Sequence, residues 1–487
     1  MAMACAAICA CLIETAGAQP MAAGAAPPAI HPKGFGAPLS TAPADPAIAH
    51  ALAEVSTARI RQTISTLVDF HTRNTLSSMD TDLPPNTGVT AAAKWVEQQF
   101  TALSEACQGC LEVKTDTFTE PADPSPHSRV KAPTTITNVY AILRGSDPAQ
   151  ASRMYLVTGH YDSINSHVFR NWADTSGDAP GANDDASGVA VSLESARVLS
   201  RHRWPATIVF VAVAGEEQGL YGSAHLAKLA KDEGWQLAGV LNNDIVGGDT
   251  TPGDTLQDKT RIRVFSQGIP ATATPDDIKR ILGLGLESDG PSRELARAIT
   301  GVGRTYFRGG TFRPVLELRL DRYLRGGDHR SFNQQGFAAV RFTEWRENFD
   351  HQHQDVRVEN GTQYGDLLKF VDFNYVANVA RLNAATLATL ASAPAAPEEV
   401  RVVTSNLDNN STLHWKPGSE TPSAPHFDIV WRDTSAPDWQ FHQPVSAAGA
   451  AKGSITLPVS KDNVIFGVRA CTPAGQCSPA VAPLPER

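Results

Sequence analysis

Apolar runs alternate with amphipathic segments through the middle of the chain, and each apolar run ends in polar or acidic residues. The runs lie at 154–158, 207–214 and 237–244, and the amphipathic segments between them lie at 189–199 and 222–232. The runs are typical of buried strands, whereas the apolar spacing of the other segments indicates helices. This order of strand, helix, strand, helix, strand is typical of a mostly parallel sheet with helices on both faces.

The pattern continues on both sides of this central part. Upstream, Ile60, Ile64, Leu67 and Val68 recur at the spacing of one helix face, which predicts a helix. Further predicted elements are a helix at 89–103, strands at 111–118, 136–143 and 261–266, a helix at 291–301, a strand at 338–342 and a helix at 367–390. We therefore expect an α/β domain over residues 47–393, built on a mostly parallel mixed sheet with helices on both faces.

A second domain is predicted after the Ala/Pro-rich segment 393–397. Short alternating runs follow at 400–403, 411–415, 427–431, 454–457 and 464–470, which predict an all-β sandwich over residues 397–487. With Trp415 on an early strand and Phe466 on a late one, this part resembles a fibronectin type III domain. The sequence leaves open whether the sandwich contacts a surface or a polysaccharide, or is only an appendage.

The two ends of the first 46 residues differ in character. An apolar run over the first 13 residues, followed by Ala16-Gly17-Ala18, predicts a signal peptide at 1–18 that is too short to span a bilayer. Residues 19–46 are rich in Ala, Pro and Gly and are predicted to be a disordered linker. Export to the periplasm or the extracellular space is therefore expected.

The four cysteines beyond the signal peptide support the same compartment. They form two close pairs, Cys107 with Cys110 and Cys471 with Cys477. Close pairs in an exported chain favour disulfides, and a zinc knuckle would need a second CxxC motif near the first. We therefore predict two disulfides.

Charge and missing motifs exclude several function classes. The chain of 487 residues carries a formal charge of −9 and no basic block, so nucleic acid is not an expected partner. It also lacks an HExxH motif, a GxSxG elbow and a Walker loop.

Acidic and imidazole side chains follow the predicted central strands. His160 and Asp162 follow the first, Glu216 and Glu217 the second, and Asp244 ends the third. Because ligands gather beyond the carboxyl ends of strands in such sheets, these side chains are expected to meet at one edge together with Asp184. Adjacent carboxylates after a buried strand repel one another unless a cation compensates, so the pattern predicts a metal site.

Chemistry suggests a role for each side chain. A two-metal hydrolytic site needs a carboxylate shared by both ions, and Asp184 is the candidate. His160 and Asp244 would complete the ligands of one ion, and Glu217 with a late histidine would complete those of the other. Glu216, beside Glu217, would then be the general base.

Four motifs carry a family resemblance: 160–163 (HYDS), 180–188 (PGANDDASG), 216–223 (EEQGLYGS) and 243–244 (ND). In these the chain resembles the co-catalytic zinc aminopeptidase family, which also contains glutamate carboxypeptidases and the protease-like domain of the transferrin receptor. The resemblance covers residues 71–390 and implies two zinc ions per chain. It implies that Asp184 bridges the two ions, that His160, Glu217 and Asp244 are further zinc ligands, and that Glu216 is the general acid/base. Asp162 would hold the His160 imidazole in the tautomer that binds zinc.

The resemblance selects the last ligand as well. In the family a histidine is followed four residues later by an aspartate, which fits His351 with Asp355. His353 is the competitor, since it would lie on the same side of an extended strand. His351 is the prediction.

Residues that contact substrate are less well marked. Asp328 and His329, after a Gly-rich loop, resemble a substrate-side motif of the family, and Tyr323 is a candidate to stabilise the oxyanion. Glu344, at a predicted strand end, is a candidate for the free α-amine of a substrate. The alternative for these residues is an ordinary structural role.

Together these features predict an exported zinc aminopeptidase that acts on peptides or proteins, in which water is activated at a zinc pair and Glu216 is the base. A carboxypeptidase or dipeptidase on the same core is one alternative. It would need a cationic clamp for a substrate carboxylate, for which Arg325, Arg330 and Arg341 are available. The other alternative is a catalytically silent receptor or adhesion protein, which would be expected to lack some of the ligands.

Overall fold

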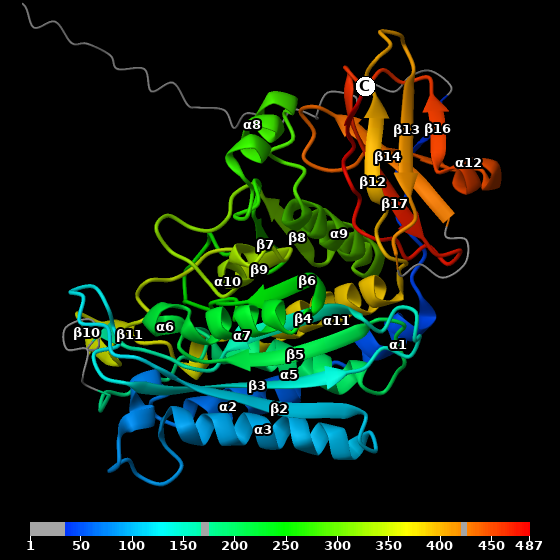
Figure 1. Cartoon of the computed structure of the whole chain (residues 1–487). Helices are drawn as coiled ribbons and strands as arrows, with labels where there is room; N and C mark the ends of the chain where they lie inside the picture. Colours follow the sequence, from blue (N-terminus) through cyan, green and yellow to red (C-terminus); the bar gives the residue numbers. More distant parts are fainter. Residues whose placement is uncertain (1–34, 167–174, 420–425) are drawn as a thin grey trace, which may run out of the picture.

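The computed structural model describes residues 35–166, 175–419 and 426–487, so the predicted signal peptide and most of the predicted linker lie outside the described residues. One eight-stranded sheet dominates the first domain (Figure 1). Its strands, in spatial order, are β2 (Leu111–Glu120), β3 (Thr134–Leu143), β5 (Thr207–Val213), β4 (Arg153–His160), β6 (Gln236–Asn243), β9 (Ala339–Glu344), β7 (Arg261–Ser266) and β8 (Arg313–Glu317).

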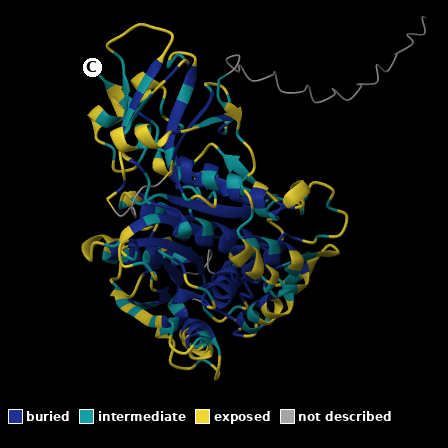
Figure 2. Ribbon diagram, turned by 90° about the vertical axis from the view of Figure 1, so that its right-hand side faces the viewer, coloured by how far each residue is buried: buried dark blue, intermediate teal, exposed yellow. Residues whose placement is uncertain are grey.

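The centre of this sheet is parallel and its edges are antiparallel. Strands β5, β4, β6 and β9 run parallel to one another. At one edge β3 pairs antiparallel with both β5 and β2, and at the other β7 pairs antiparallel with β9. All residues of β4, β5 and β9 are buried, as expected for strands covered on both faces (Figure 2). The predicted mixed α/β fold is confirmed.

Helices cover both faces of the sheet. One face packs on α1 (Pro46–Ala53), α2 (Thr57–Val68), α3 (Gly88–Ala106), α5 (Ala186–Leu199), α9 (Pro291–Tyr306) and α11 (Phe373–Ser392). The other face packs on α7 (Tyr221–Asp232) and α10 (His329–Gln334). Alternate residues of β4 divide between these two cores: Tyr155 and Val157 face the first, and Met154 and Leu156 the second.

The remaining elements of this domain are short or peripheral. They are η1 (Thr75–Met79), α6 (Glu216–Gly219), α8 (Pro275–Leu284), η2 (Arg308–Gly310), β10 (Arg357–Glu359), β11 (Thr362–Tyr364) and η3 (Leu368–Phe370). The helix predicted from residue 367 begins only at Phe373. Asp372 caps it there, because its carboxylate accepts hydrogen bonds from the backbone N–H groups of Asn374 and Tyr375 at 3.0 and 3.1 Å.

The C-terminal part forms two four-stranded sheets around a core of its own. One sheet has the order β16 (Ser454–Leu457), β13 (Ser411–Lys416), β12 (Glu398–Val403) and β18 (Leu484–Glu486). The other has the order β1 (Ala37–Pro38), β15 (Phe441–Pro444), β14 (His426–Asp433) and β17 (Val464–Cys471), and α12 (Ala447–Lys452) lies beside them. A separate β domain follows the α/β domain, as predicted.

The end of the predicted linker is ordered, which corrects the expectation of disorder up to residue 46. Residues 37–38 pair with β15 as an edge strand of the C-terminal sheet. Phe35 stacks on Trp431 with ring centroids 6.1 Å apart. Gly36 permits this approach, because a Cβ atom there would lie 2.1 Å from the Trp431 ring. The N-terminal segment is therefore part of the C-terminal fold.

A buried ionic cluster joins the two domains. Arg432 of β14 donates to Asp289 Oδ1 at 2.6 Å, and Arg297 of α9 pairs with the same oxygen at 3.2 Å. Trp439 Nε1 donates to Glu294 at 3.0 Å. Because these side chains are buried and bonded across the junction, the domains are held in a fixed contact.

Both predicted disulfides are present. Cys107 is bonded to Cys110 and Cys471 to Cys477. Within the described residues, no helix is both long and apolar enough to cross a membrane.

Candidate metal centre

The carboxyl ends of the central strands bring the predicted side chains to one place. β4 ends at His160, β6 ends immediately before Asp244, and β5 is followed by the short helix α6, which begins with Glu216 and Glu217. Asp184 lies in the loop that leads into α5. Gly159 lets the first turn of α5 approach β4, since a Cβ atom on Gly159 would lie 2.4 Å from the Gly188 carbonyl carbon.

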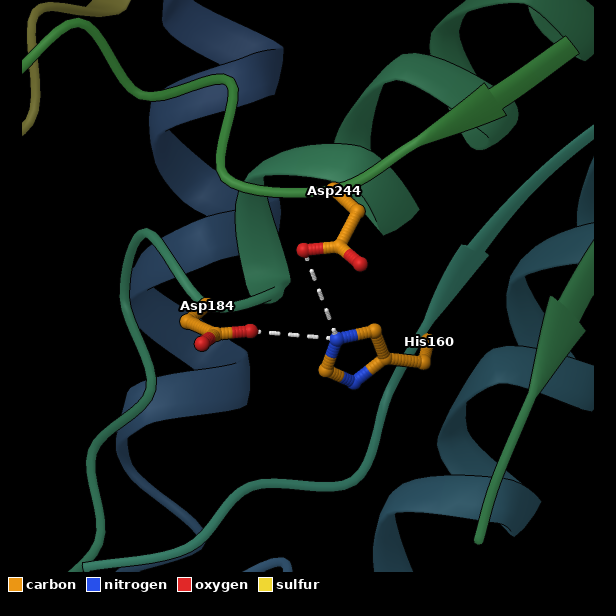
Figure 3. A group of neighbouring side chains, drawn as sticks. All are labelled: His160, Asp184 and Asp244. Atoms are coloured by element: carbon orange, nitrogen blue, oxygen red, sulfur yellow. Dashed lines mark ion pairs between the residues drawn. The ribbon is translucent and has the colours of Figure 1, made fainter. Parts of the chain in front are cut away.

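Three buried side chains form a first group of possible metal ligands (Figure 3). His160 Nε2 lies 3.1 Å from Asp184 Oδ1 and 3.9 Å from Asp244 Oδ1. Figure 3 shows the two carboxylates pointing toward the same imidazole nitrogen from different segments of chain.

A second group shares Asp184 with the first. His353 Nε2 lies 2.8 Å from Asp184 Oδ2 and 3.1 Å from Glu217 Oε1. The two oxygens of Asp184 thus face different groups, one toward His160 and the other toward His353. This is the arrangement that a carboxylate bridging two metal ions requires.

The donor set fits divalent zinc. His160 Nε2 and Glu217 Oε1 are buried and make no hydrogen bond among the described residues, although each lies 3.1 Å from an atom of another residue in its own group. In each group the three candidate ligand atoms lie within 4.8 Å of one another, close enough for one ion to bind all three. Imidazole nitrogen and carboxylate oxygen are also common zinc ligands.

The electrostatics of the pocket call for added positive charge. Burial raises the pKa of Asp244 above its usual value. The charge of Arg341 opposes this shift, and the charge of Asp184 adds to it. Burial and the Asp184 charge likewise raise the pKa of Glu217, against the effect of His353. Carboxylates this close in a buried site disfavour one another's ionised form, and metal cations would remove that penalty.

The prediction of His351 as the last ligand is corrected. His351 Nδ1 is hydrogen-bonded to Asp249, and its ring stacks on Phe370 with centroids 3.6 Å apart. The prediction followed the family pattern of a histidine four residues before an aspartate, and the extended strand was the argument for His353. Residues 351–353 instead form a turn in which His353 has a left-handed φ of 57°. The two imidazoles therefore diverge, and His353 is the one that reaches Asp184 and Glu217.

Asp162 lies behind the first group, on the Nδ1 side of His160. That nitrogen is 3.1 Å from the Asp162 backbone oxygen and 3.4 Å from its carboxylate Oδ1. Thr75 Oγ1 and the Glu217 backbone N–H donate to the other carboxylate oxygen at 3.0 and 3.2 Å. With Nδ1 occupied by these oxygens, Nε2 is the atom turned toward Asp184 and Asp244.

Two further residues hold the loop that carries Asp184. The Asp366 carboxylate accepts hydrogen bonds from the backbone N–H groups of Asn183 and Asp184 at 2.9 and 2.7 Å. The fully buried Arg73 donates to the carbonyls of Pro180 and Gly181 at 2.6 and 2.8 Å, and to that of Tyr161 at 2.6 Å. Arg73 thereby ties the Asp184 loop to the segment that follows β4.

An open cavity of about 390 Å³ lies over both groups. Asp184, Asp244, Glu217 and His353 form part of its wall, and the half-buried Glu216 lines it without belonging to either group. Burial, together with repulsion from Asp244 and Glu217, raises the pKa of Glu216 well above its usual value.

The four predicted substrate contacts do not line this cavity. Tyr323 is 84% exposed and lies against Arg319. His329 is buried, with Nε2 3.0 Å from the Leu320 carbonyl oxygen, and Asp328 is buried beside it. Glu344 is buried and accepts from Asn183 Nδ2 at 3.1 Å. Three of the side chains are therefore covered and the fourth faces solvent, and their contact with substrate stays a prediction.

Several residues of the cavity wall were not predicted as site residues. They are Arg129, Gln218, Leu324 and Arg322, together with Gln352, whose Nε2 donates to Asp184 Oδ2 at 3.1 Å. Apart from Gln218, which lies in α6, they are in loops without hydrophobic periodicity, so no pattern marked them. For Gln352, the feature of the sequence that could have indicated a place in the site is its position between His351 and His353.

Comparisons with known proteins agree with this chemistry. Residues 138–279 match the family described as "Peptidase family M28". A "Probable zinc metalloprotease" of Pyrenophora teres f. teres is 43% identical over 93% of this chain and 90% of its own length. Another of the same description, from Pyricularia oryzae, is 44% identical over 89% of this chain and 84% of its own.

Among solved structures, the LapA aminopeptidase of Legionella pneumophila is 19% identical. It covers 71% of this chain and 74% of its own, with a TM-score of 0.47.

Proposed function

Because the chain belongs to the zinc metallopeptidases of family M28, we propose that it is a two-zinc exopeptidase, specifically an aminopeptidase. The observation that carries this proposal is the position of Asp184 between two groups of ligands, with Glu216 next to them in the cavity wall. The proposed ligands are His160, Asp184 and Asp244 for one ion, and Asp184, Glu217 and His353 for the other.

The zinc pair would polarise the scissile carbonyl and lower the pKa of water in the cavity. Glu216 would accept a proton from that water and pass it to the departing amine. Its position suits this exchange, because it lines the cavity beside the proposed ligand Glu217 without belonging to either ligand group. Asp162 would hold the His160 imidazole in the tautomer that leaves Nε2 free for metal.

Hydrolysis of matched peptides tests this proposal. Zinc-loaded protein is incubated with an aminoacyl anilide, a free dipeptide and the same dipeptide with an acetylated N-terminus. An aminopeptidase cleaves the first two and leaves the acetylated peptide intact. Cleavage of the acetylated peptide alone would contradict the proposal in favour of a carboxypeptidase.

The carboxypeptidase or dipeptidase alternative has one observation in its favour. Arg325 and Arg330 line the cavity, as a clamp for a substrate carboxylate would require. Arg341 does not take part, because it is buried and donates to Asp244 Oδ1 at 2.8 Å. A catalytically silent receptor is disfavoured, since such a protein has no need for the complete donor set and the additional Glu216.

We also propose that the protein is exported and that its C-terminal domain is of the fibronectin type III kind. The two disulfides support export, since such bonds persist in oxidising compartments. The two facing sheets and the buried Trp415 support the domain assignment. Cell fractionation with thiol labelling tests export: the proposal requires protein outside the cytoplasm with Cys107 and Cys110 unavailable to the label.

A further inference from the structure

Four arginines line the cavity above the candidate metal centre. They are Arg129, Arg322, Arg325 and Arg330, which come from three separate parts of the sequence: the β2–β3 connection, the loop after β8, and α10. The carboxylates in the same wall are Asp184, Glu216, Glu217 and Asp244. All four belong to the proposed ligands or the proposed base.

Three of these arginines have partners within the protein. Arg322 Nη1 pairs with Glu347 at 2.6 Å, and Arg325 pairs with the same carboxylate oxygen at 3.1 Å. Arg129 donates to the Glu217 backbone oxygen. These bonds hold the three guanidinium groups in place in the wall.

Arg330 differs from the other three. Among the described residues its guanidinium has no ion pair and no hydrogen bond, and it lies half-buried against Gly326, where a Cβ atom would be 2.8 Å from Nη1. Its nitrogens are not among the buried side-chain atoms that lack a partner, so solvent reaches the group and a carboxylate that enters the cavity can take the place of that water. The guanidinium offers five N–H donors in a planar fork that fits a carboxylate.

The charge balance of the cavity points the same way. Two divalent cations would neutralise the four carboxylates of the wall, and the four arginines would then dominate its potential. Glu347 offsets part of that charge from outside the cavity, through Arg322 and Arg325. The uncompensated positive charge is therefore centred on Arg330.

We propose that Arg330 binds a carboxylate of the peptide substrate, which makes this enzyme selective for substrates with an anionic group next to the scissile bond. The inference rests on the proposed function and adds to it the class of substrate. The carboxylate has two possible sources, an acidic side chain or the free C-terminus of a short peptide. Both present the same group to the guanidinium.

Three matched pairs of dipeptides separate these sources. Ala-Ala free acid against Ala-Ala amide tests the terminal carboxylate. Ala-Asp amide against Ala-Asn amide, and Asp-Ala amide against Asn-Ala amide, test acidic side chains on either side of the bond. Wild-type zinc-loaded protein should prefer the anionic member of at least one pair about tenfold in kcat/KM, the effect of one charge-assisted hydrogen bond. High salt should reduce this preference.

Arg330→Gln tests the residue itself. The variant should lower the preference for the anionic member to less than about twofold, chiefly by raising KM, because the lost contact is made in the ground state as well. Arg330→Lys should restore part of the preference, since it keeps the charge without the fork. Arg319→Gln is the matched control: this arginine lies in the same region, is exposed and is outside the cavity wall. It should leave the preference unchanged.

The possible outcomes are distinct. Equal hydrolysis within all three pairs by wild-type protein overturns the inference and leaves the proposed function standing. A preference that survives Arg330→Gln, or that falls equally in Arg319→Gln, also overturns it. No hydrolysis of any of the six peptides by zinc-loaded protein contradicts the proposed function and this inference together.

Discussion

At the scale of single residues, the site shows where sequence patterns suffice and where they do not. His160, Glu217 and Asp244 follow apolar strands, so their convergence at one sheet edge could be predicted from the order of elements. The choice between His351 and His353 could not, because it depends on the turn at 351–353 and its left-handed residue. Backbone conformation in a polar loop leaves no periodic signal.

Alanine substitutions at the two histidines test this correction. His353→Ala should lose one of the two zinc ions and most activity, since its Nε2 reaches Asp184 and Glu217. His351→Ala should keep both ions, because its hydrogen bond goes to Asp249. Zinc content by atomic emission distinguishes them. Zinc loss in His351→Ala with full zinc in His353→Ala would restore the original prediction.

Glu216→Gln tests the proposed base. The variant should bind as much zinc as wild-type protein, because Glu216 is in neither ligand group. Turnover should fall by about 10²–10⁴-fold, the usual contribution of general acid–base catalysis. Glu105→Gln, on the exposed surface of α3, is the control and should be fully active. Near-normal turnover in Glu216→Gln would show that another group is the base.

At the scale of elements, the strands and helices of the central sheet were predictable because their apolar spacing is regular. The strand 261–266 was placed at its observed bounds, whereas β8 and α8 were missed. The missed α8 does carry sequence signals of a helix, a capping box of Thr274 with Asp277 and a proline at its start, although none of its residues is buried. The loops that shape the cavity could not be predicted from patterns, since they are held by specific hydrogen bonds.

Arg73 is one such contact, joining α2, the segment after β4 and the Asp184 loop. Its guanidinium donates to four backbone carbonyls, those of Leu67, Tyr161, Pro180 and Gly181. Arg73→Met should lower the free energy of unfolding by about 3–5 kcal/mol, because these buried carbonyls lose their donors. It should also weaken zinc binding. Arg59→Met, on the exposed face of α2, is the control. Equal stability of the two variants in urea would contradict this role.

At the scale of the whole molecule, the junction between the domains was outside the reach of sequence patterns. The sequence predicted two domains and a disordered linker, but residues 37–38 complete a C-terminal sheet and Asp289 reaches across to Arg432. Both contacts join positions far apart in the chain, and a short Pro-rich strand carries no periodic signal of its own.

Glu294 makes this junction sensitive to pH. Burial raises the pKa of Glu294 to about 7. The charge of Arg297 opposes this shift, and the charge of Asp289 adds to it. In the unfolded chain the carboxyl group has an ordinary pKa, so between about pH 4.5 and 7 the folded protein holds a proton that the unfolded chain has lost. The free energy of unfolding should therefore fall by up to about 3 kcal/mol as the pH rises through this window.

Glu294→Gln should abolish that fall, because glutamine can still accept from Trp439 but does not titrate. Urea unfolding of wild-type protein and variant at pH 5 and pH 8 measures the difference. The same loss of stability in both proteins would assign the pH dependence to another group.

The number of zinc ions bound per chain tests the central claim most directly. Native mass spectrometry of the zinc-loaded full chain counts the ions without any assumption about substrate. The sharing of Asp184 between the two groups predicts two ions per chain in wild-type protein and fewer in Asp184→Asn. A chain that carries a single ion at saturating zinc, or none, would contradict the two-metal site.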